Sequence, residues 1–192
     1  YALAIFPKLS GASVDHQADA FGRHLSIGIR QILFWALPFS VLFIVLRAHI
    51  VRGILGSGVF DWADTRLVAA ILAVLSVAIV SESLLPLILR AFYALGRTRE
   101  PLVCDVVGSA ATISLAFGFS LWFRAAPEAL SAVAQILRIG DLANPQVLAV
   151  AAGFSLGSII NIVLLFFALR RVSAERLGLR VPVETGPLAT LL

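Results

Sequence analysis

Five polar or ionisable side chains lie inside long apolar blocks of the sequence. They are Arg30, Glu82, Arg90, Asp105 and Asn161. An ionisable group that faces lipid is costly, so such residues are rare in membrane spans and usually face a polar cavity or a partner. We therefore predict these five as candidates for a substrate or ion pathway through a membrane.

Three of the charged candidates have alternative interpretations. Arg30 and Arg90 lie close enough to the ends of their apolar blocks for a long side chain to reach the lipid head groups. Asp105 has a short side chain, so inside a membrane it would need a partner or a shifted pKa. It either joins a cation path or stays hydrated near the membrane surface, four residues after Pro101.

Glu82, Pro86 and Arg90 follow one another at intervals of four residues, which places them on one face of a helix. Pro86 frees a backbone carbonyl on that face because it has no N–H group. One interpretation is a polar, kinked face toward a cavity. The other is that Glu82 is simply hydrogen-bonded to Ser81, Ser83 or a neighbouring helix.

Asn161 lies near the middle of the last apolar block, after Ser155 and Ser158. Such groups commonly hold membrane helices together by interhelical hydrogen bonds, and small residues such as Gly153 and Gly157 allow close approach. A structural role is the favoured interpretation for Asn161, and a contact with cargo is the alternative.

No arrangement typical of catalysis is present in the sequence. His16, His24 and His49 are scattered in predicted connections, and no glycine-rich phosphate loop follows a strand. Cys104 is the only cysteine, which excludes an internal disulfide and a cysteine-based metal site. We expect no enzyme activity, no bound cofactor and no metal.

The composition identifies the elements that must position these residues. Hydrophobic residues make up 60% of the chain and charged residues 14%, against roughly 45–50% and about 25% in soluble domains. The net charge of +4 is dispersed along the chain, which argues against a nucleic-acid partner. We predict an all-α, polytopic membrane helix bundle with four transmembrane helices, at about 27–46, 66–95, 101–123 and 145–170.

The remaining segments are expected to be connections. Residues 1–26 are predicted to hold the end of a preceding span and an amphipathic cytoplasmic helix, and 130–137 a short interfacial helix. Residues 171–192 are predicted to be a cytoplasmic connection and the start of a further span. Because the chain contains no Met, we expect it to be a fragment of a longer protein.

The orientation follows from the basic residues of the connections, which are retained on the cytoplasmic side. Nine lie on the side of the two chain ends and five on the other, which predicts cytoplasmic ends. The nine are Lys8, Arg23, Arg30, Arg97, Arg99, Arg170, Arg171, Arg176 and Arg180, and the five are Arg47, Arg52, Arg66, Arg124 and Arg138.

Two geometric predictions follow. The helix over 64–95 is expected to bend near Pro86, because the proline ring clashes with the carbonyl four residues earlier. Arg90 and Asp105 flank the tight turn at 96–101, so at about 1.5 Å per residue they should lie at similar depths. We predict that they form an ion pair.

Three motifs together resemble the MurJ/MviN family of lipid II flippases, within the multidrug/oligosaccharidyl-lipid/polysaccharide exporter superfamily. They cover nearly the whole chain in the family's order and spacing. They are Phe6-Pro-Lys-Leu-Ser10 with the run Phe21 to Arg30, the loop from Ile50 to Thr65 that ends Phe-Asp-Trp-Ala-Asp-Thr, and Arg90-Ala-Phe-Tyr-Ala-Leu-Gly96 with Thr98 and Pro101.

The resemblance implies the C-terminal half of a fourteen-span flippase in the bacterial cytoplasmic membrane. Its partners would be lipid II and membrane lipids, its mechanism alternating access, and its energy source a sodium or proton gradient or the membrane potential. The alternatives are export of another lipid-linked oligosaccharide or of drugs, or a membrane scaffold that transports nothing.

The sequence departs from the family pattern at several positions. Arg97 replaces a usual Asp, Glu100 a usual Thr, and Pro86 a frequent Lys. Family Asn positions fall at Thr112 and Ala116, which argues against a family-type cation site there. The arginines that the family uses to bind pyrophosphate lie upstream of this chain.

Overall fold

The computed structural model describes residues 18–55, 61–125, 128, 135 and 147–177. In these ranges the backbone forms α-helices and no β-strand, so the predicted all-α helix bundle is confirmed. The predicted segment before residue 18, nearly all of the interfacial helix at 130–137 and the apolar tail fall outside them.

The described helices provide three or four membrane crossings. α2 (Ala18–Leu55), α5 (Arg99–Ala125) and α7 (Leu148–Leu177) are each long and apolar enough to span a bilayer. α3 (Trp62–Ser76) and α4 (Ala78–Ala94) meet the same criteria only together, as one crossing bent by 41°. Each of the four predicted spans overlaps one of these crossings.

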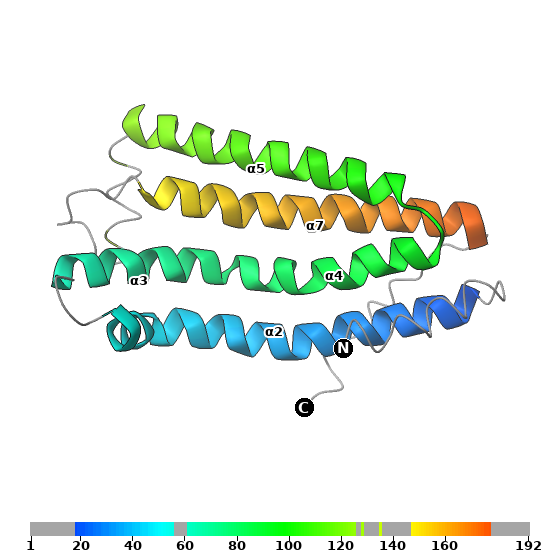
Figure 1. Ribbon diagram of the computed structural model, residues 1–192, viewed down its shortest axis with the longest axis horizontal. Helices are drawn as coiled ribbons and strands as arrows, with labels where there is room; N and C mark the ends of the chain where they lie inside the picture. The colour runs from blue at the N-terminus through cyan, green and yellow to red at the C-terminus, as the bar shows by residue number, and fades with distance from the viewer. Residues whose placement is uncertain (1–17, 56–60, 126–127, 129–134, 136–146, 178–192) are drawn as a thin grey trace.

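The helices lie side by side in the order α5, α7, α3 with α4, and α2 (Figure 1). Contacts follow this order: α5 packs on α7, α7 packs on α3 and α4, and these two pack on α2. Many large apolar side chains, such as Phe34, Val45 and Ile113, are exposed. Such side chains can face lipid in a membrane, so the bundle needs a smaller buried core than a soluble protein does.

α2 joins the predicted amphipathic segment and the first span into one helix of 38 residues. At about 1.5 Å per residue it is roughly 57 Å long, well beyond an apolar layer of about 30 Å. Its first turns bury Phe21 and Leu25 against Leu87 and Phe92 of α4 and Leu169 of α7. The extension therefore anchors α2 to its neighbours at that end of the bundle.

α3 begins at a capping box. The Asp61 carboxylate accepts a hydrogen bond from the Trp62 N–H at 2.6 Å, and the Asp64 carboxylate accepts one from the Asp61 N–H at 3.4 Å. Thr65 donates its hydroxyl to the Asp61 carbonyl at 3.1 Å. The Phe-Asp-Trp-Ala-Asp-Thr motif thus satisfies the free N–H groups of a helix start.

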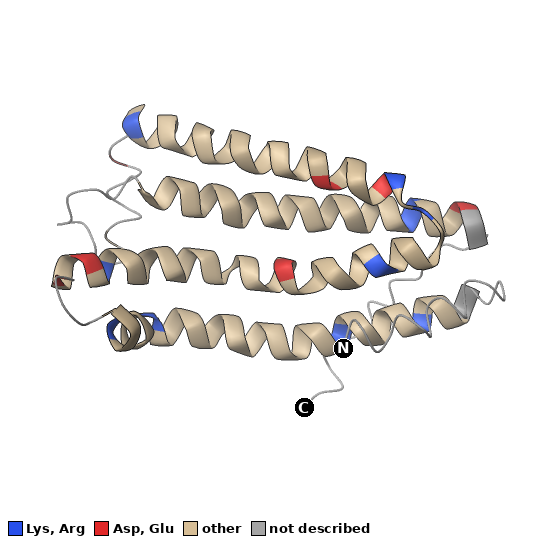
Figure 2. Ribbon diagram, viewed as in Figure 1, with Lys and Arg blue, Asp and Glu red and all other residues tan. Residues whose placement is uncertain are grey.

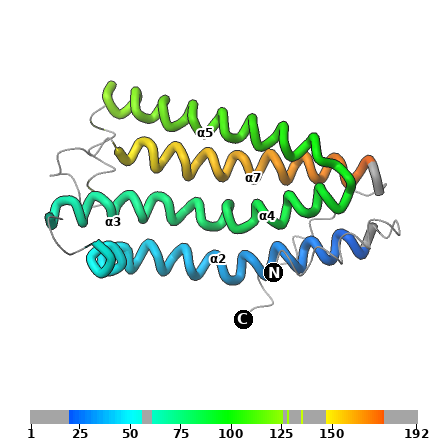
Figure 3. The backbone as a smooth tube through the Cα atoms, in the orientation of Figure 1, coloured from blue at the N-terminus to red at the C-terminus, as the bar shows by residue number. Residues whose placement is uncertain are grey.

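The bend predicted at Pro86 lies elsewhere, at Val77, where α3 ends and α4 begins (Figure 3). α4 continues through Pro86 to its end, so the prediction was wrong about the position. At this break Ser76 donates its own hydroxyl to the Leu72 carbonyl at 2.6 Å, and two serines from neighbouring helices contact backbone carbonyls. Ser40 of α2 donates its hydroxyl to the Ser76 carbonyl at 2.6 Å, and Ser155 of α7 donates to the Val74 carbonyl at 2.8 Å. Side chains that insert into the backbone hydrogen-bond ladder are a known cause of bends.

The turn from α4 to α5 is closed by a Schellman motif. The Gly96 N–H donates to the Tyr93 carbonyl at 3.0 Å and the Arg97 N–H to the Phe92 carbonyl at 3.0 Å. Gly96 has a φ of 68°, a left-handed conformation that favours glycine. The Ala-Leu-Gly of the third motif therefore ends one helix and directs the next one back.

Replacing Gly96 with alanine should destabilise the protein by about 1–2 kcal/mol, because a Cβ is unfavourable at a left-handed residue. Gly22, inside α2 with open space around its Cα, is the matched control. The same replacement there should stabilise the helix by about 0.5–1 kcal/mol. Thermal unfolding of the full-length protein in detergent would measure both, and equal signs for the two variants would contradict the assignment.

α5 and α7 approach closely through small residues. A Cβ added to Gly153 would overlap the backbone of Ala116, and one added to Gly157 would overlap the Thr112 side chain. Gly108 of α5 is equally covered by the Asn161 side chain. Glycines on both helices thus let the two backbones approach, as small residues commonly do in membranes.

Candidate functional site

Glu82 lies in the second turn of α4 and forms a hydrogen bond with α7. The Ser158 hydroxyl donates to its Oε1 at 2.8 Å. Ser81 and Ser83 instead donate to carbonyls of their own helix, those of Ala78 and Ile79. Of the partners considered from sequence, the neighbouring helix is therefore the one observed, and Glu82 remains exposed.

A cavity of about 600 Å³ lies between α2 and α4. Ser83 and Pro86 line it from α4 and Gln31 and Trp35 from α2, with five further apolar residues. Pro86 shares its helix face with Glu82 and Arg90, but neither of these two charged residues lines the cavity. The volume is within the range of about 300–1,000 Å³ that small-molecule sites occupy.

Arg90 is half-buried, and its Nη1 atom is buried without a hydrogen-bond partner among the described residues. A buried donor without an acceptor is costly, so its presence needs an explanation. Arg30 of α2 is exposed. The two arginines thus differ in environment: Arg30 is exposed, whereas Arg90 has a buried donor that lacks an acceptor.

Asp105 accepts a hydrogen bond from the Asn161 Nδ2 at 3.0 Å, which links α5 to α7. The predicted ion pair with Arg90 was wrong: no contact within 4 Å joins the two charges in the described part of the chain. The reason is lateral, because α7 packs between α4 and α5 (Figure 1). The Asn161 Oδ1 is itself buried without a partner.

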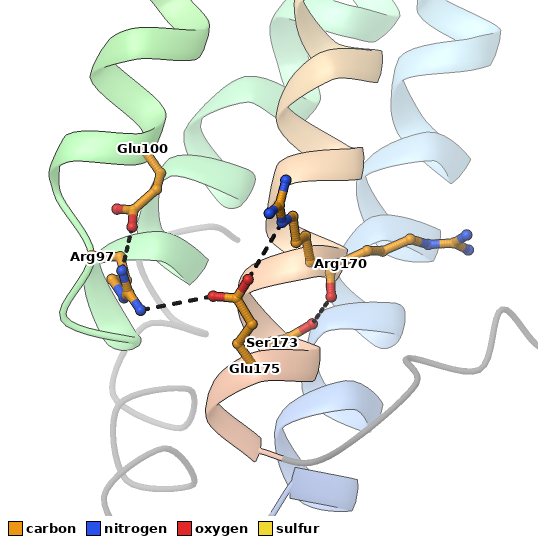
Figure 4. Close-up of polar contacts among 6 residues, drawn as sticks. Arg97, Glu100, Arg170, Ser173 and Glu175 are labelled. Atoms are coloured by element: carbon orange, nitrogen blue, oxygen red, sulfur yellow. Dashed lines mark hydrogen bonds and ion pairs between the residues drawn. The ribbon is translucent and has the colours of Figure 1, made fainter.

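Charged side chains concentrate toward the helix ends, with few along the middle of the crossings (Figure 2). At the end that holds the α4–α5 turn they form a cluster that sequence reasoning missed (Figure 4). Arg97 contacts Glu100 at 2.6 Å and Glu175 of α7 at 3.9 Å, and Glu175 lies 3.4 Å from Arg171. The sequence could have indicated these pairs, because Arg97 and Glu100 are three residues apart and Arg171 and Glu175 four apart, spacings that place opposite charges side by side on a helix.

This cluster joins two of the departures from the family pattern, because Arg97 and Glu100 pair with each other. As the side chains are partly exposed, the pairs contribute little stability individually. In the described ranges no three His, Cys, Asp or Glu side chains gather where they could share a metal ion.

Comparison with known proteins identifies one family. The sequence model described as "Lipid II flippase MurJ" matches residues 1–174. No curated protein and no solved structure matches the chain. The matched range includes all helices that border the cavity and hold the polar residues, and it supports lipid II over the alternative cargoes. The chain therefore belongs to the MurJ family of lipid II flippases, which act in the bacterial cytoplasmic membrane.

Proposed function

We propose that this chain forms part of one lobe of an alternating-access flippase, and that the polar face of α4 borders the path of the cargo. The family match over residues 1–174 is the observation that carries the proposal. Two helical lobes that rock around a central site are a common design of membrane transporters. In this scheme the chain supplies one wall of the path, and other spans of the protein supply the opposite wall.

Arg90 is the residue of this face best suited to an anionic cargo. Its Nη1 is buried without an acceptor, so a phosphate oxygen that reaches it would gain a charge-assisted hydrogen bond without displacing an internal one. Glu82, exposed and held by Ser158, contributes the opposite charge on the same face. The two charges favour a cargo with both anionic and hydrogen-bonding groups, as lipid II has.

The energy source in this proposal is a cation gradient or the membrane potential. Asp105 is the group that supports a cation-linked step. Its partner Asn161 has a buried Oδ1 that receives no hydrogen bond among the described residues. A carboxylate and an amide oxygen are both acceptors, and this pair therefore supports the proposed cation-linked step.

The function is tested by complementation. We expect the full-length protein to restore growth and wall synthesis in cells depleted of their own lipid II flippase. If the depleted cells survived but labelled lipid II did not reach the outer leaflet, the protein would carry a different cargo.

Arg90 provides a sharper test, because stability and transport should change in opposite directions. Arg90→Leu removes a buried donor without an acceptor, so unfolding stability should rise by about 1–3 kcal/mol while transport falls. Arg99→Leu, at the exposed start of α5, is the control and should change neither markedly. Loss of both stability and transport in Arg90→Leu would instead indicate a structural role.

A further inference from the structure

A second, smaller cavity of about 260 Å³ lies where α2, α4 and α7 meet. Hydrocarbon side chains alone line it: Ile29, Leu84, Ile88, Ile162, Val163, Phe166 and Phe167. Val163 and Phe167 are 44% and 62% exposed, so the cavity opens on the outer surface of the helices. The cavity thus suits a hydrocarbon chain that enters sideways from the membrane.

Arg170 lies one helical turn beyond Phe166 on α7, and its guanidinium carbon stands 4.7 Å from the centre of the Phe166 ring. This cation–π contact holds the guanidinium next to the cavity, because Phe166 is part of the cavity wall. The Arg170 Nε is buried and has no hydrogen-bond partner among the described residues.

The nearby acidic cluster does not neutralise Arg170. Figure 4 shows the Arg170 side chain extending away from Glu100 and Glu175. Glu175 instead pairs with Arg97 and Arg171. Arg170 is therefore a cation with an unused donor beside an apolar cavity, and the complementary ligand carries an anion at the head of a hydrocarbon chain.

The depth of Arg170 suits a phosphate at the membrane surface. Arg170 lies within the last two turns of α7, which ends at Leu177. That end of the bundle also holds the start of α2 and the α4–α5 turn (Figure 1), and the count of basic residues assigns it to the cytoplasm. The cytoplasmic leaflet is rich in anionic lipids, and basic pockets between membrane helices bind their head groups.

We propose that this is a binding site for one anionic phospholipid of the cytoplasmic leaflet. Its phosphate accepts hydrogen bonds from Arg170, and one acyl chain occupies the cavity between α2, α4 and α7. The cavity is smaller than the roughly 300–1,000 Å³ of sites for drug-sized molecules and has no polar lining side chain, so it does not suit a sugar-bearing head group. The site is thus separate from the cargo path beside Glu82 and Arg90, and it joins three helices through a lipid.

The test uses the delipidated full-length protein in detergent, titrated with dioleoyl phosphatidylglycerol or with dioleoyl phosphatidylcholine. Bound lipids are counted by native mass spectrometry, and the melting temperature is recorded. We expect the wild type to bind phosphatidylglycerol more tightly. Arg170→Gln should weaken that binding about tenfold, the equivalent of one lost charge-assisted hydrogen bond. It should weaken phosphatidylcholine binding less, because the choline cation already offsets the charge of that lipid's phosphate, so the preference for phosphatidylglycerol should shrink.

Arg171→Gln is the matched control, since Arg171 is the next residue and its side chain is 85% exposed. It should retain the preference for phosphatidylglycerol. Val163→Trp fills the cavity and should weaken the binding of both lipids, and Arg170→Lys should keep most of the anionic preference. Melting in lipid-free detergent shows that each variant is folded.

Three outcomes would overturn the site. Equal phosphatidylglycerol binding by Arg170→Gln and Arg171→Gln would remove the role of Arg170. If Val163→Trp bound both lipids as well as the wild type does, no acyl chain would occupy the cavity. Displacement of phosphatidylglycerol by an undecaprenyl-pyrophosphate lipid would assign the site to cargo. None of these measurements depends on transport, so they are independent of the proposed function.

Discussion

Replacing Gly153 with valine is expected to separate α5 from α7 and to destabilise the protein by about 3 kcal/mol, the upper end of the usual cost of overpacking. A Cβ at this position would lie 2.8 Å from the Ala116 Cβ and closer still to the Ala116 backbone. A backbone cannot move aside as a side chain can, so the helices themselves would have to shift. Thermal unfolding of the full-length protein, together with its expression level in membranes, would measure the loss.

Gly118 is the control for this experiment. It lies on α5, two residues from Ala116, and open space surrounds its Cα. Valine there adds the same side chain to the neighbouring helix without meeting α7, so the change should be within about 0.5 kcal/mol. If both variants lost stability equally, the close approach of α5 and α7 would not be the cause.

The second large effect is expected at Asp105 and Asn161. Asp105→Ala leaves the Asn161 Nδ2 without its acceptor, beside an Oδ1 that already lacks a partner. Asp105→Asn should be milder, because an amide oxygen can still accept the hydrogen bond. A double-mutant cycle of Asp105→Ala with Asn161→Ala should give a coupling of about 0.5–3 kcal/mol, measured by unfolding of the full-length protein.

A cycle of Asp105→Ala with Arg90→Ala provides the comparison. Since α7 separates the two helices that carry these residues, their effects should add within about 0.5 kcal/mol. Strong coupling between Asp105 and Arg90, with none between Asp105 and Asn161, would support the predicted ion pair and contradict the hydrogen bond seen in the structure.

The ion pair illustrates why sequence reasoning succeeds along a helix and fails across one. The depths of Arg90 and Asp105 follow from the constant rise per residue and the tight turn between their helices. Their lateral relation does not, because helices joined by a short turn need not share a packed face. Here α7, from a later part of the chain, lies between them and supplies Asn161 as the partner.

The bend is a similar case. The prediction rested on Pro86, which favours a bend by local rules because it lacks an N–H group. The hydroxyl that donates to the Val74 carbonyl comes from Ser155 and the one that donates to the Ser76 carbonyl from Ser40, both far away in the sequence. No local pattern distinguishes a serine that donates to a backbone carbonyl of another helix from one that donates within its own helix, as Ser83 does.

The sequence by itself determined the class of this protein, an all-α membrane helix bundle, and its family. Apolar blocks long enough to cross a bilayer must become helices, because no water is available there to satisfy the peptide groups. Local signals also mark the helix ends, at Asp61 and Gly96. Only the tertiary structure decided which polar groups of different helices meet: Glu82 with Ser158, and Asp105 with Asn161. Side-chain partners depend on how helices are ordered and rotated about their axes, and many distant packing contacts set that order together.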